Sequence, residues 1–161
     1  MSSHEEDVQK VTELVESAKL AVVTTVGAEG QLVSRPLAVQ QRDFDGDLWF
    51  FTQDPSSKTD QVRENDQVNV SLQVSDGWLS IAGTATVSKD RSKIDELWSA
   101  GAEAWFENGK DDPTVALLQV HADSAEYWTM NSPKVVAMVK YAKAMITGER
   151  PNVGDNASVD L

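Results

Sequence analysis

The chain has 161 residues, of which 40% are hydrophobic, and this is enough for one domain with a single core. Its 26 acidic residues outnumber its 14 lysines and arginines, and the net charge of −12 argues against nucleic acid or an anionic membrane as a partner. The absence of cysteine excludes disulfides and thiolate chemistry, and the two histidines, His4 and His121, lie too far apart in the chain to suggest a metal centre.

The N-terminal segment is acidic and polar, which is unlike a signal peptide. No apolar run approaches the roughly 18 residues that a membrane helix needs. We therefore expect a cytoplasmic protein that does not enter a membrane.

The spacing of apolar residues predicts the secondary structure in chain order. A first helix is expected over residues 5–19, where apolar side chains recur at intervals of three and four. The β-branched run at 20–26 predicts a buried strand, and the alternation of apolar and polar residues at 67–75 and 78–88 predicts two more. The remaining strands are expected at 31–41, 48–52, 115–121 and 124–130, and the remaining helices at 54–65, 89–101 and 132–148.

Short strands joined by hairpins, with a few helices outside them, predict an antiparallel α+β fold built on a closed barrel. We expect one domain over residues 1–148 and a loose, polar C-terminal tail over residues 149–161.

Arg35 is the most informative single residue. It shares its parity in the predicted strand with Val33 and Leu37, so it projects from the apolar face, where a guanidinium is costly unless it meets an anion. Pro36 has no N–H and predicts an edge or a bulge, which leaves backbone groups free to pair with a ligand. The alternative is that Arg35 forms a salt bridge at a barrel end or in a dimer interface.

A second group of residues lies where a strand ends and a helix begins, over residues 52–58. A helix start offers unpaired N–H groups and a partial positive charge, to which Ser57 and Lys58 add a hydroxyl and a full charge. This combination suits a phosphate monoester. The alternative is ordinary helix capping, with Asp54 or Ser56 as the N-cap.

Trp78, Trp105 and Trp128 are candidates for stacking against a flat ring, although core packing or a dimer interface would also explain them. No catalytic triad, carboxylate dyad or glycine-rich dinucleotide motif stands out in the sequence. A redox reaction in this protein would therefore need a bound organic cofactor.

Taken together, these residues resemble the FMN-binding split barrels of the pyridoxamine phosphate oxidase superfamily, and in particular the bacterial general stress proteins. The segments that carry the resemblance occur in the family's order over about residues 5–130. They are Ser34-Arg35-Pro36-Leu37, Leu48-Trp49-Phe50-Phe51-Thr52 with Ser57-Lys58, Ser80-Ile81-Ala82-Gly83-Thr84-Ala85, Trp105-Phe106 with Gly109-Lys110-Asp111-Asp112-Pro113, and Glu126-Tyr127-Trp128.

The resemblance implies an antiparallel split β-barrel with peripheral helices, and an FMN site formed across the interface of a homodimer. Arg35 and Lys58 would hold the FMN phosphate with help from the hydroxyls of Thr52 and Ser57, and the backbone around Pro36 would meet the flavin ring. Residues of the opposite subunit would approach the same FMN. The implied cofactor-binding set is Ser34, Arg35, Pro36, Leu37, Phe51, Thr52, Ser57 and Lys58 from one subunit, with Trp105, Lys110 and Trp128 from the other.

The sequence also departs from the true oxidases, which carry a lysine where this chain has Gln40 and end in a substrate-gripping segment that this chain lacks. The resemblance thus implies FMN binding more strongly than pyridoxamine phosphate oxidation. We expect an FMN-dependent oxidoreductase with a small-molecule electron donor or acceptor, and we name no catalytic residue and no metal. The alternatives are a flavin storage or sensing protein without turnover, and a deazaflavin-dependent reductase.

Overall fold

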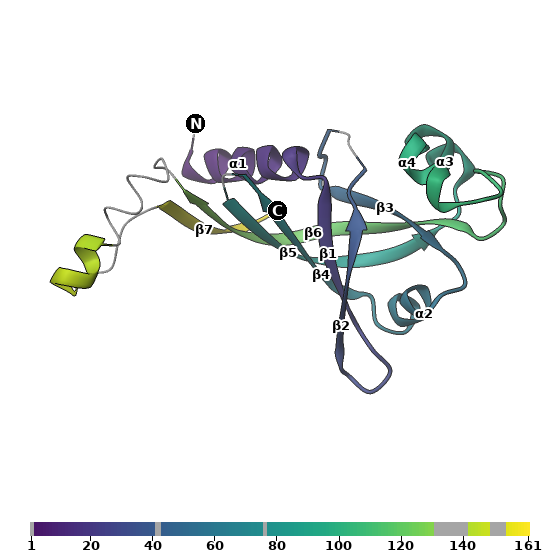
Figure 1. Cartoon of the computed structure of the whole chain (residues 1–161), viewed down its shortest axis with the longest axis horizontal. Helices are drawn as coiled ribbons and strands as arrows, with labels where there is room; N and C mark the ends of the chain where they lie inside the picture. Colours follow the sequence, from purple (N-terminus) through teal and green to yellow (C-terminus); the bar gives the residue numbers. More distant parts are fainter. Residues whose placement is uncertain (1, 41–42, 76, 131–141, 149–153) are drawn as a thin grey trace.

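The computed structural model describes residues 2–40, 43–75, 77–130, 142–148 and 154–161, and it consists of one antiparallel sheet with helices packed around it (Figure 1). The strand order is β2-β1-β4-β5-β6-β3, and β7 pairs with β6 beside this path. The helices include α1 (Ser3–Ser17), α2 (Ser57–Glu64), α3 (Arg91–Leu97) and α4 (Ala100–Trp105). The strands are β1 (Leu20–Val26), β2 (Leu32–Ala38), β3 (Asp47–Gln53), β4 (Gln67–Val74), β5 (Gly77–Ser88), β6 (Val115–Met130) and β7 (Gly154–Asp160). The antiparallel α+β split-barrel class is confirmed.

The sheet curls but does not close, so the expectation of a closed barrel is wrong. β2 and β3 lie at the two ends of the strand order. Among the described residues, the backbone hydrogen bond that joins the segment after β2 to β3 runs from the Gln40 N–H to the Trp49 carbonyl, at 3.4 Å. The register of β2 explains the opening. Because Val39 donates to the Lys19 carbonyl, the backbone polar groups of Pro36 face away from β1, toward the free edge. A proline there removes a donor that a continuing ladder would need.

One long strand, β6, replaces the two strands that were expected at residues 115–121 and 124–130. In the ladder between β5 and β6, Ala82 pairs with Ser124 while Gly83 pairs with Ala122, so Asp123 is an extra residue in a β-bulge. Gly83 is needed at this point, because a Cβ there would lie 2.5 Å from the His121 carbonyl oxygen. The bulge lets β6 pair with β3 over one half and with β7 over the other.

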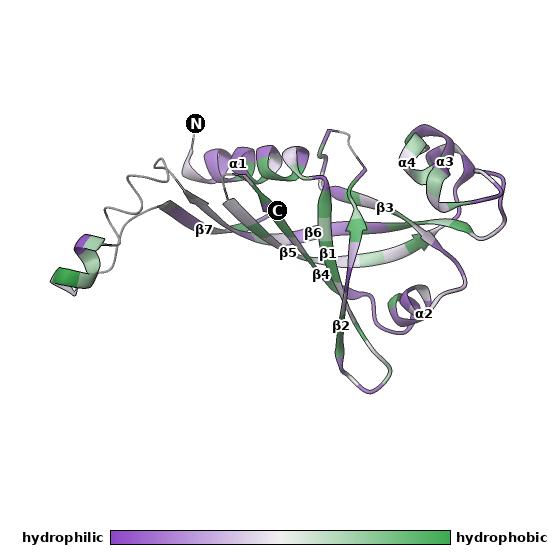
Figure 2. Ribbon diagram, in the orientation of Figure 1, coloured by the Kyte–Doolittle hydropathy of each residue, from purple (hydrophilic) through white to green (hydrophobic). Residues whose placement is uncertain are grey.

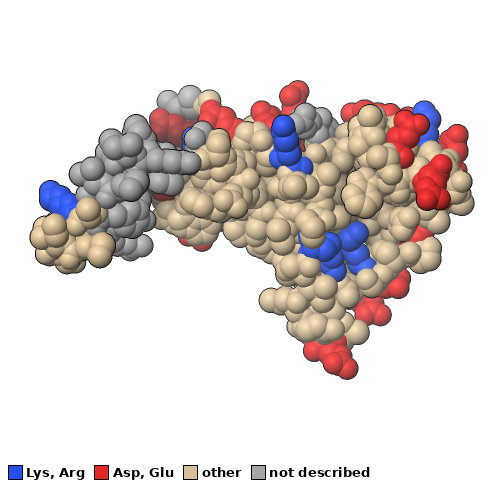
Figure 3. All heavy atoms as spheres, in the orientation of Figure 1, with Lys and Arg blue, Asp and Glu red and all other residues tan. Residues whose placement is uncertain are grey.

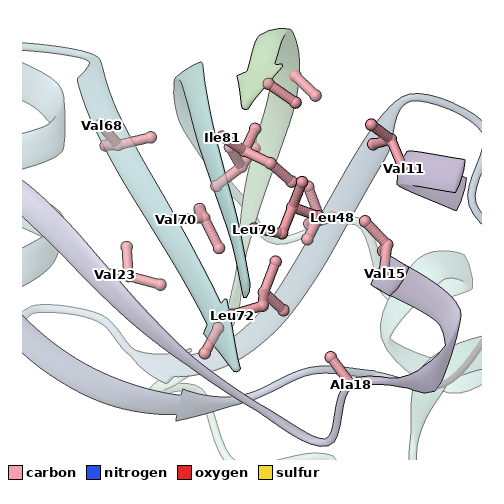
Figure 4. Close-up of a cluster of buried hydrophobic side chains, with 14 of the residues drawn as sticks. Val11, Val15, Ala18, Val23, Leu48, Val68, Val70, Leu72, Leu79 and Ile81 are labelled. Atoms are coloured by element: carbon pink, nitrogen blue, oxygen red, sulfur yellow. The ribbon is translucent and has the colours of Figure 1, made fainter. Parts of the chain in front are cut away.

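The main core lies inside the curled sheet and is closed on one side by α1 (Figure 4). Val11 and Val15 project from α1 toward Leu48 of β3 and Leu79 of β5. A second apolar cluster forms on the other face of β3, where Trp49 packs with Ile94 and Leu97 of α3 and with Phe106, which follows α4. Figure 2 shows that α3 and α4 carry both hydrophobic and hydrophilic residues. Because successive residues of a strand point to opposite faces, β3 contributes to both clusters.

The helical segment after β5 is also divided. A single helix was expected over 89–101, but α3 ends at Leu97 and Ser99 caps a new helix, its hydroxyl accepting a hydrogen bond from the Ala102 N–H at 3.2 Å. The N-cap preference of serine thus overrides the helical periodicity. None of the described helices has the length and apolar character of a membrane span.

The expectation of a loose C-terminal tail is wrong for residues 154–160, which form β7. The polar composition of this segment gave no sign of a strand, yet the strand buries Val159 and pairs along its whole length with β6. An edge strand needs few apolar residues, because its backbone hydrogen bonds and one apolar face hold it in place. Most of the helix expected over 132–148 lies outside the described residues, and residues 142–147 of it are helical.

Candidate anion-binding site

Arg35 lies on the half-buried face of β2, as its parity predicted. Its Nη1 donates to Thr25 Oγ1 at 2.7 Å and to the backbone carbonyls of Val33 and Val23 at 3.0 and 3.3 Å. Its Nη2 donates to Gln61 Oε1 at 3.2 Å. All of these partners are neutral. Within the described residues no carboxylate pairs with Arg35, so the salt bridge considered from the sequence is not found there.

Lys58 lies in the first turn of α2. Ser56 caps this helix, its hydroxyl accepting a hydrogen bond from the Thr59 N–H at 3.3 Å. The helix start therefore has the ordinary cap that was considered as the alternative, and it also carries Lys58 in its first turn. The Nζ atom of Lys58 donates to Thr52 Oγ1 at 2.7 Å, which ties the helix start to the buried end of β3. The hydroxyl of Ser57 is exposed at the same helix end.

The structure brings Arg35 to the helix that carries Lys58, because Arg35 donates to Gln61, one turn after Lys58 in α2. Burial, and after it the positive charge of Arg35, lowers the pKa of the Lys58 ammonium below its usual value, and burial likewise lowers the pKa of Arg35. Two neighbouring cations without a counter-charge repel each other and lose hydration, so the arrangement is unfavourable until an anion joins it. Basic side chains gather beside the β1–β2 hairpin and α2 in Figure 3.

The carboxylate nearest in sequence does not neutralise this pair. Asp54 is buried, and Arg63 donates to its two carboxylate oxygens at 2.7 Å each. The Nζ atom of Lys89 lies 3.4 Å from Asp54 Oδ2. The hydrogen bonds from Arg63 hold the pKa of Asp54 well below its usual range. Because Asp54 is already paired with other cations, the positive charge of Arg35 and Lys58 remains available to a ligand.

The free edge of β2 borders this site. Ser34 and Pro36 point away from the core, and the Ser34 hydroxyl lies 2.7 Å from that of Thr24. Leu37 shares the inward face with Arg35 and packs against the main core. The edge therefore offers backbone groups that no described strand uses, next to two cations.

The other residues of the predicted set lie elsewhere. The side chain of Phe51 projects from the face of β3 opposite to Thr52 and packs edge-on against Trp98, with ring centroids 5.4 Å apart. Trp105 is 80% exposed at the end of α4, and Lys110 pairs with Asp95 at 3.4 Å. A contribution of Trp105, Lys110 and Trp128 to a site on a second subunit stays a prediction.

Trp128 lies on the outer face of the sheet, opposite Trp78 across the β5–β6 ladder. Both side chains are partly exposed, at 39% and 45%, and together with Val22 they line a shallow groove of about 550 Å³. Leu20 is exposed on the same face of β1. The outer face thus carries exposed apolar side chains on β1, β5 and β6, with the polar Ser71 and Gln73 of β4 between them.

Two residues of the site were missed from the sequence, Thr25 and Gln61. Thr25 occupies an inward position of β1, where Ala21 and Val23 are buried, and this polar residue at an apolar position was a usable signal. Gln61 lies one helical turn after Lys58, so it shares that face of α2.

Comparison with known proteins places this geometry in context. Residues 6–152 match the family model described as pyridoxamine 5'-phosphate oxidase like. Protein bli-3 of Neurospora crassa is 29% identical over 160 residues, which cover 90% of this chain and 77% of that protein.

Two crystal structures are similar over most of the chain. A Jannaschia sp. CCS1 protein named after general stress protein 26 is 26% identical, with a TM-score of 0.78 over 98% of this chain and 99% of its own. The general stress FMN/FAD binding protein of Xanthomonas citri is 29% identical, with a TM-score of 0.70 over 80% of this chain and 92% of its own.

Proposed function

The chain belongs to the pyridoxamine 5'-phosphate oxidase-like family, in its general stress protein branch, and from this premise we propose that it is a flavoprotein whose Arg35 and Lys58 hold the phosphate of FMN. The observation that carries the proposal is the pair of neighbouring cations without a carboxylate partner among the described residues. A phosphate monoester is a compact dianion at neutral pH, which matches two cations and a helix start. The Xanthomonas citri relative is named for binding FMN or FAD, which supports the same assignment.

In this proposal, different residues of the site contact different parts of the cofactor. Arg35 and Lys58 supply charge, Thr52 and Ser57 supply hydroxyls, and the free edge of β2 supplies backbone groups for the polar rim of the ring. Bound FMN supplies reversible uptake of one or two electrons, and the protein supplies position and electrostatics. On this basis we assign the protein to the oxidoreductases, with a small-molecule electron donor or acceptor.

A second candidate is storage or sensing of flavin without turnover. It is favoured by one observation: within the described residues, no carboxylate or imidazole forms a hydrogen bond with Arg35, Lys58 or Thr52. A site without an acid or base can bind a flavin and still lack a proton-transfer step. Anaerobic reduction by nicotinamide dinucleotides, followed in a stopped-flow instrument, separates the two, because multiple rapid turnovers would rule out pure storage.

We also propose that the working site lies in a homodimer. The apolar surface around Leu20, Val22, Trp78 and Trp128 is exposed in the single chain, and surfaces of this kind commonly mark protein interfaces. A second copy seated there would cover these side chains and bring Trp128 near the neighbouring subunit.

The test of flavin binding is the absorbance spectrum of the purified protein. We expect a yellow preparation, or a colourless one that becomes yellow when FMN is added and the excess is removed. A protein that cannot be reconstituted with FMN would overturn the proposal. Preference for a deazaflavin cofactor over FMN in a parallel titration would reassign the protein to the deazaflavin-dependent reductases.

A further inference from the structure

Arg35 is held by a closed ring of hydrogen bonds that involves two residues outside the predicted site. The Thr25 hydroxyl accepts from Arg35 Nη1 at 2.7 Å and donates to Gln61 Oε1 at 2.7 Å. The same Gln61 oxygen accepts from Arg35 Nη2 at 3.2 Å. Thr25 is fully buried, so its single hydroxyl proton is committed to Gln61 and cannot be shared with water.

This ring leaves a defined part of the guanidinium available. Thr25 Oγ1 and Gln61 Oε1 lie side by side and engage Nη1 and Nη2, which are the end of the planar group. The second Nη1 hydrogen is directed to the backbone carbonyls of Val33 and Val23. What remains is the side edge of the group, with Nε–H and the second Nη2–H, and no described residue accepts a hydrogen bond from it.

The side edge of a guanidinium is a two-donor fork that matches two oxygens of a phosphate. A flexible arginine would have to order this fork at the moment of binding, at the cost of side-chain entropy. Here the fork is ordered in advance, because Thr25 and Gln61 come from β1 and α2, two elements fixed by the core.

We propose that Gln61, acting with Thr25, is the positioning residue that presents the side edge of Arg35 to a phosphate monoester, and so determines the preference for phosphorylated over unphosphorylated flavin. This inference rests on the proposed function. In this proposal Gln61 acts through Arg35, because its oxygen accepts the hydrogen bonds from Thr25 and Arg35. Gln61 therefore affects how tightly the phosphate is held and leaves the contacts to the isoalloxazine ring of the flavin unchanged.

The test compares the affinities of FMN and riboflavin, which differ by the phosphate, in variants of the full chain stripped of flavin. We expect Gln61→Ala to raise the Kd of FMN on the order of tenfold and to change that of riboflavin by less than about twofold. Thr25→Val, which removes the hydroxyl at similar volume, should do the same, whereas Thr25→Ser keeps the hydroxyl and should retain the wild-type preference. Gln9→Ala, at an exposed glutamine of α1, is the matched control.

Thermal unfolding of each variant shows whether it is folded. If Gln61→Ala does not fold, Gln61→Met removes the acceptor oxygen at similar side-chain length and should reduce the preference for FMN in the same way. Wild-type protein that binds FMN no more tightly than riboflavin would overturn the proposed phosphate site itself. A wild-type preference that persists unchanged in Gln61→Ala and Thr25→Val would overturn only the positioning role.

Discussion

The ammonium of Lys58, in the first turn of α2, lies close enough to the guanidinium of Arg35 in β2 that its pKa is lowered, by burial first and by the neighbouring charge second. Perturbed pKa values cluster at functional sites, and two like charges held near each other favour the binding of a ligand of opposite charge. The relationship joins two segments that are distant in the sequence, and neither residue is paired with an acid in the described part of the chain.

Removing either cation should weaken FMN and spare riboflavin. A charge-assisted contact to phosphate contributes about 1.5–3 kcal/mol, so Lys58→Ala should raise the Kd of FMN roughly tenfold to a hundredfold. Fluorescence titration with both flavins checks this, with Lys10→Ala on α1 as a control cation distant from the site. Equal losses for FMN and riboflavin would place Lys58 away from the phosphate.

Binding of FMN should also depend on pH in the alkaline range. The lowered pKa of Lys58 means that its ammonium deprotonates at a lower pH than an ordinary lysine, and a bound dianion favours the protonated form. We therefore expect FMN affinity to fall as the pH rises through the lowered pKa of Lys58, with proton uptake on binding below the usual lysine range. Isothermal titration in buffers of different ionisation enthalpy measures this uptake, and its absence in Lys58→Met is the control.

The Asp54–Arg63 pair should stabilise the fold rather than the ligand. Because the pKa of Asp54 is lowered, its contribution is present above the ordinary carboxyl pKa and is lost as the pH falls through the lowered value. We expect Asp54→Asn to reduce the melting temperature on the order of 5 °C at neutral pH, with a smaller difference in acid. Asp111→Asn, which removes an exposed pair with Arg91, should have little effect, and equal shifts in both variants would contradict the assignment.

The outer face of the sheet should control the oligomeric state. Val22 is 44% exposed on this face, so Val22→Asp leaves the core of the single chain intact but places a desolvated charge in the proposed interface. We expect light scattering to show a dimer for the wild-type protein and for Ala28→Asp, in the hairpin turn, and a monomer for Val22→Asp. A Val22→Asp protein that remains dimeric would move the interface elsewhere.

Trp128 tests whether that face also contacts the flavin. If Trp128 of one subunit lies against the flavin ring of the other, Trp128→Ala should weaken FMN and riboflavin by similar factors, on the order of tenfold, because both carry the same ring. Titration with the two flavins measures this. Affinities that do not change would remove Trp128 from the site.

The sequence predicted the local placement of Arg35 and Lys58 better than it predicted the pairing of the sheet, because that placement depends on single segments. The parity of Arg35 and the helix start at Lys58 are properties of single segments, and both were found in the structure. The convergence of the two segments was implied by the family resemblance. Periodicity does not reveal which strands pair with one another, and the bulge at Asp123 and strand β7 depend on pairing with residues far away in the chain. Gln61 was missed for the same reason, since an exposed-looking glutamine in a helix acquires its role only when β1 and β2 lie beside it.

Pro36 has a further effect that concerns the behaviour of the protein at high concentration. An uncapped strand at the end of a sheet is a template on which another chain can add a strand, and this is a common start of aggregation. The proline removes the donor from the middle of that edge, so an approaching strand would leave one of its acceptors unsatisfied. The same residue that keeps backbone groups of β2 open to a small molecule therefore also protects the sheet against uncontrolled polymerisation.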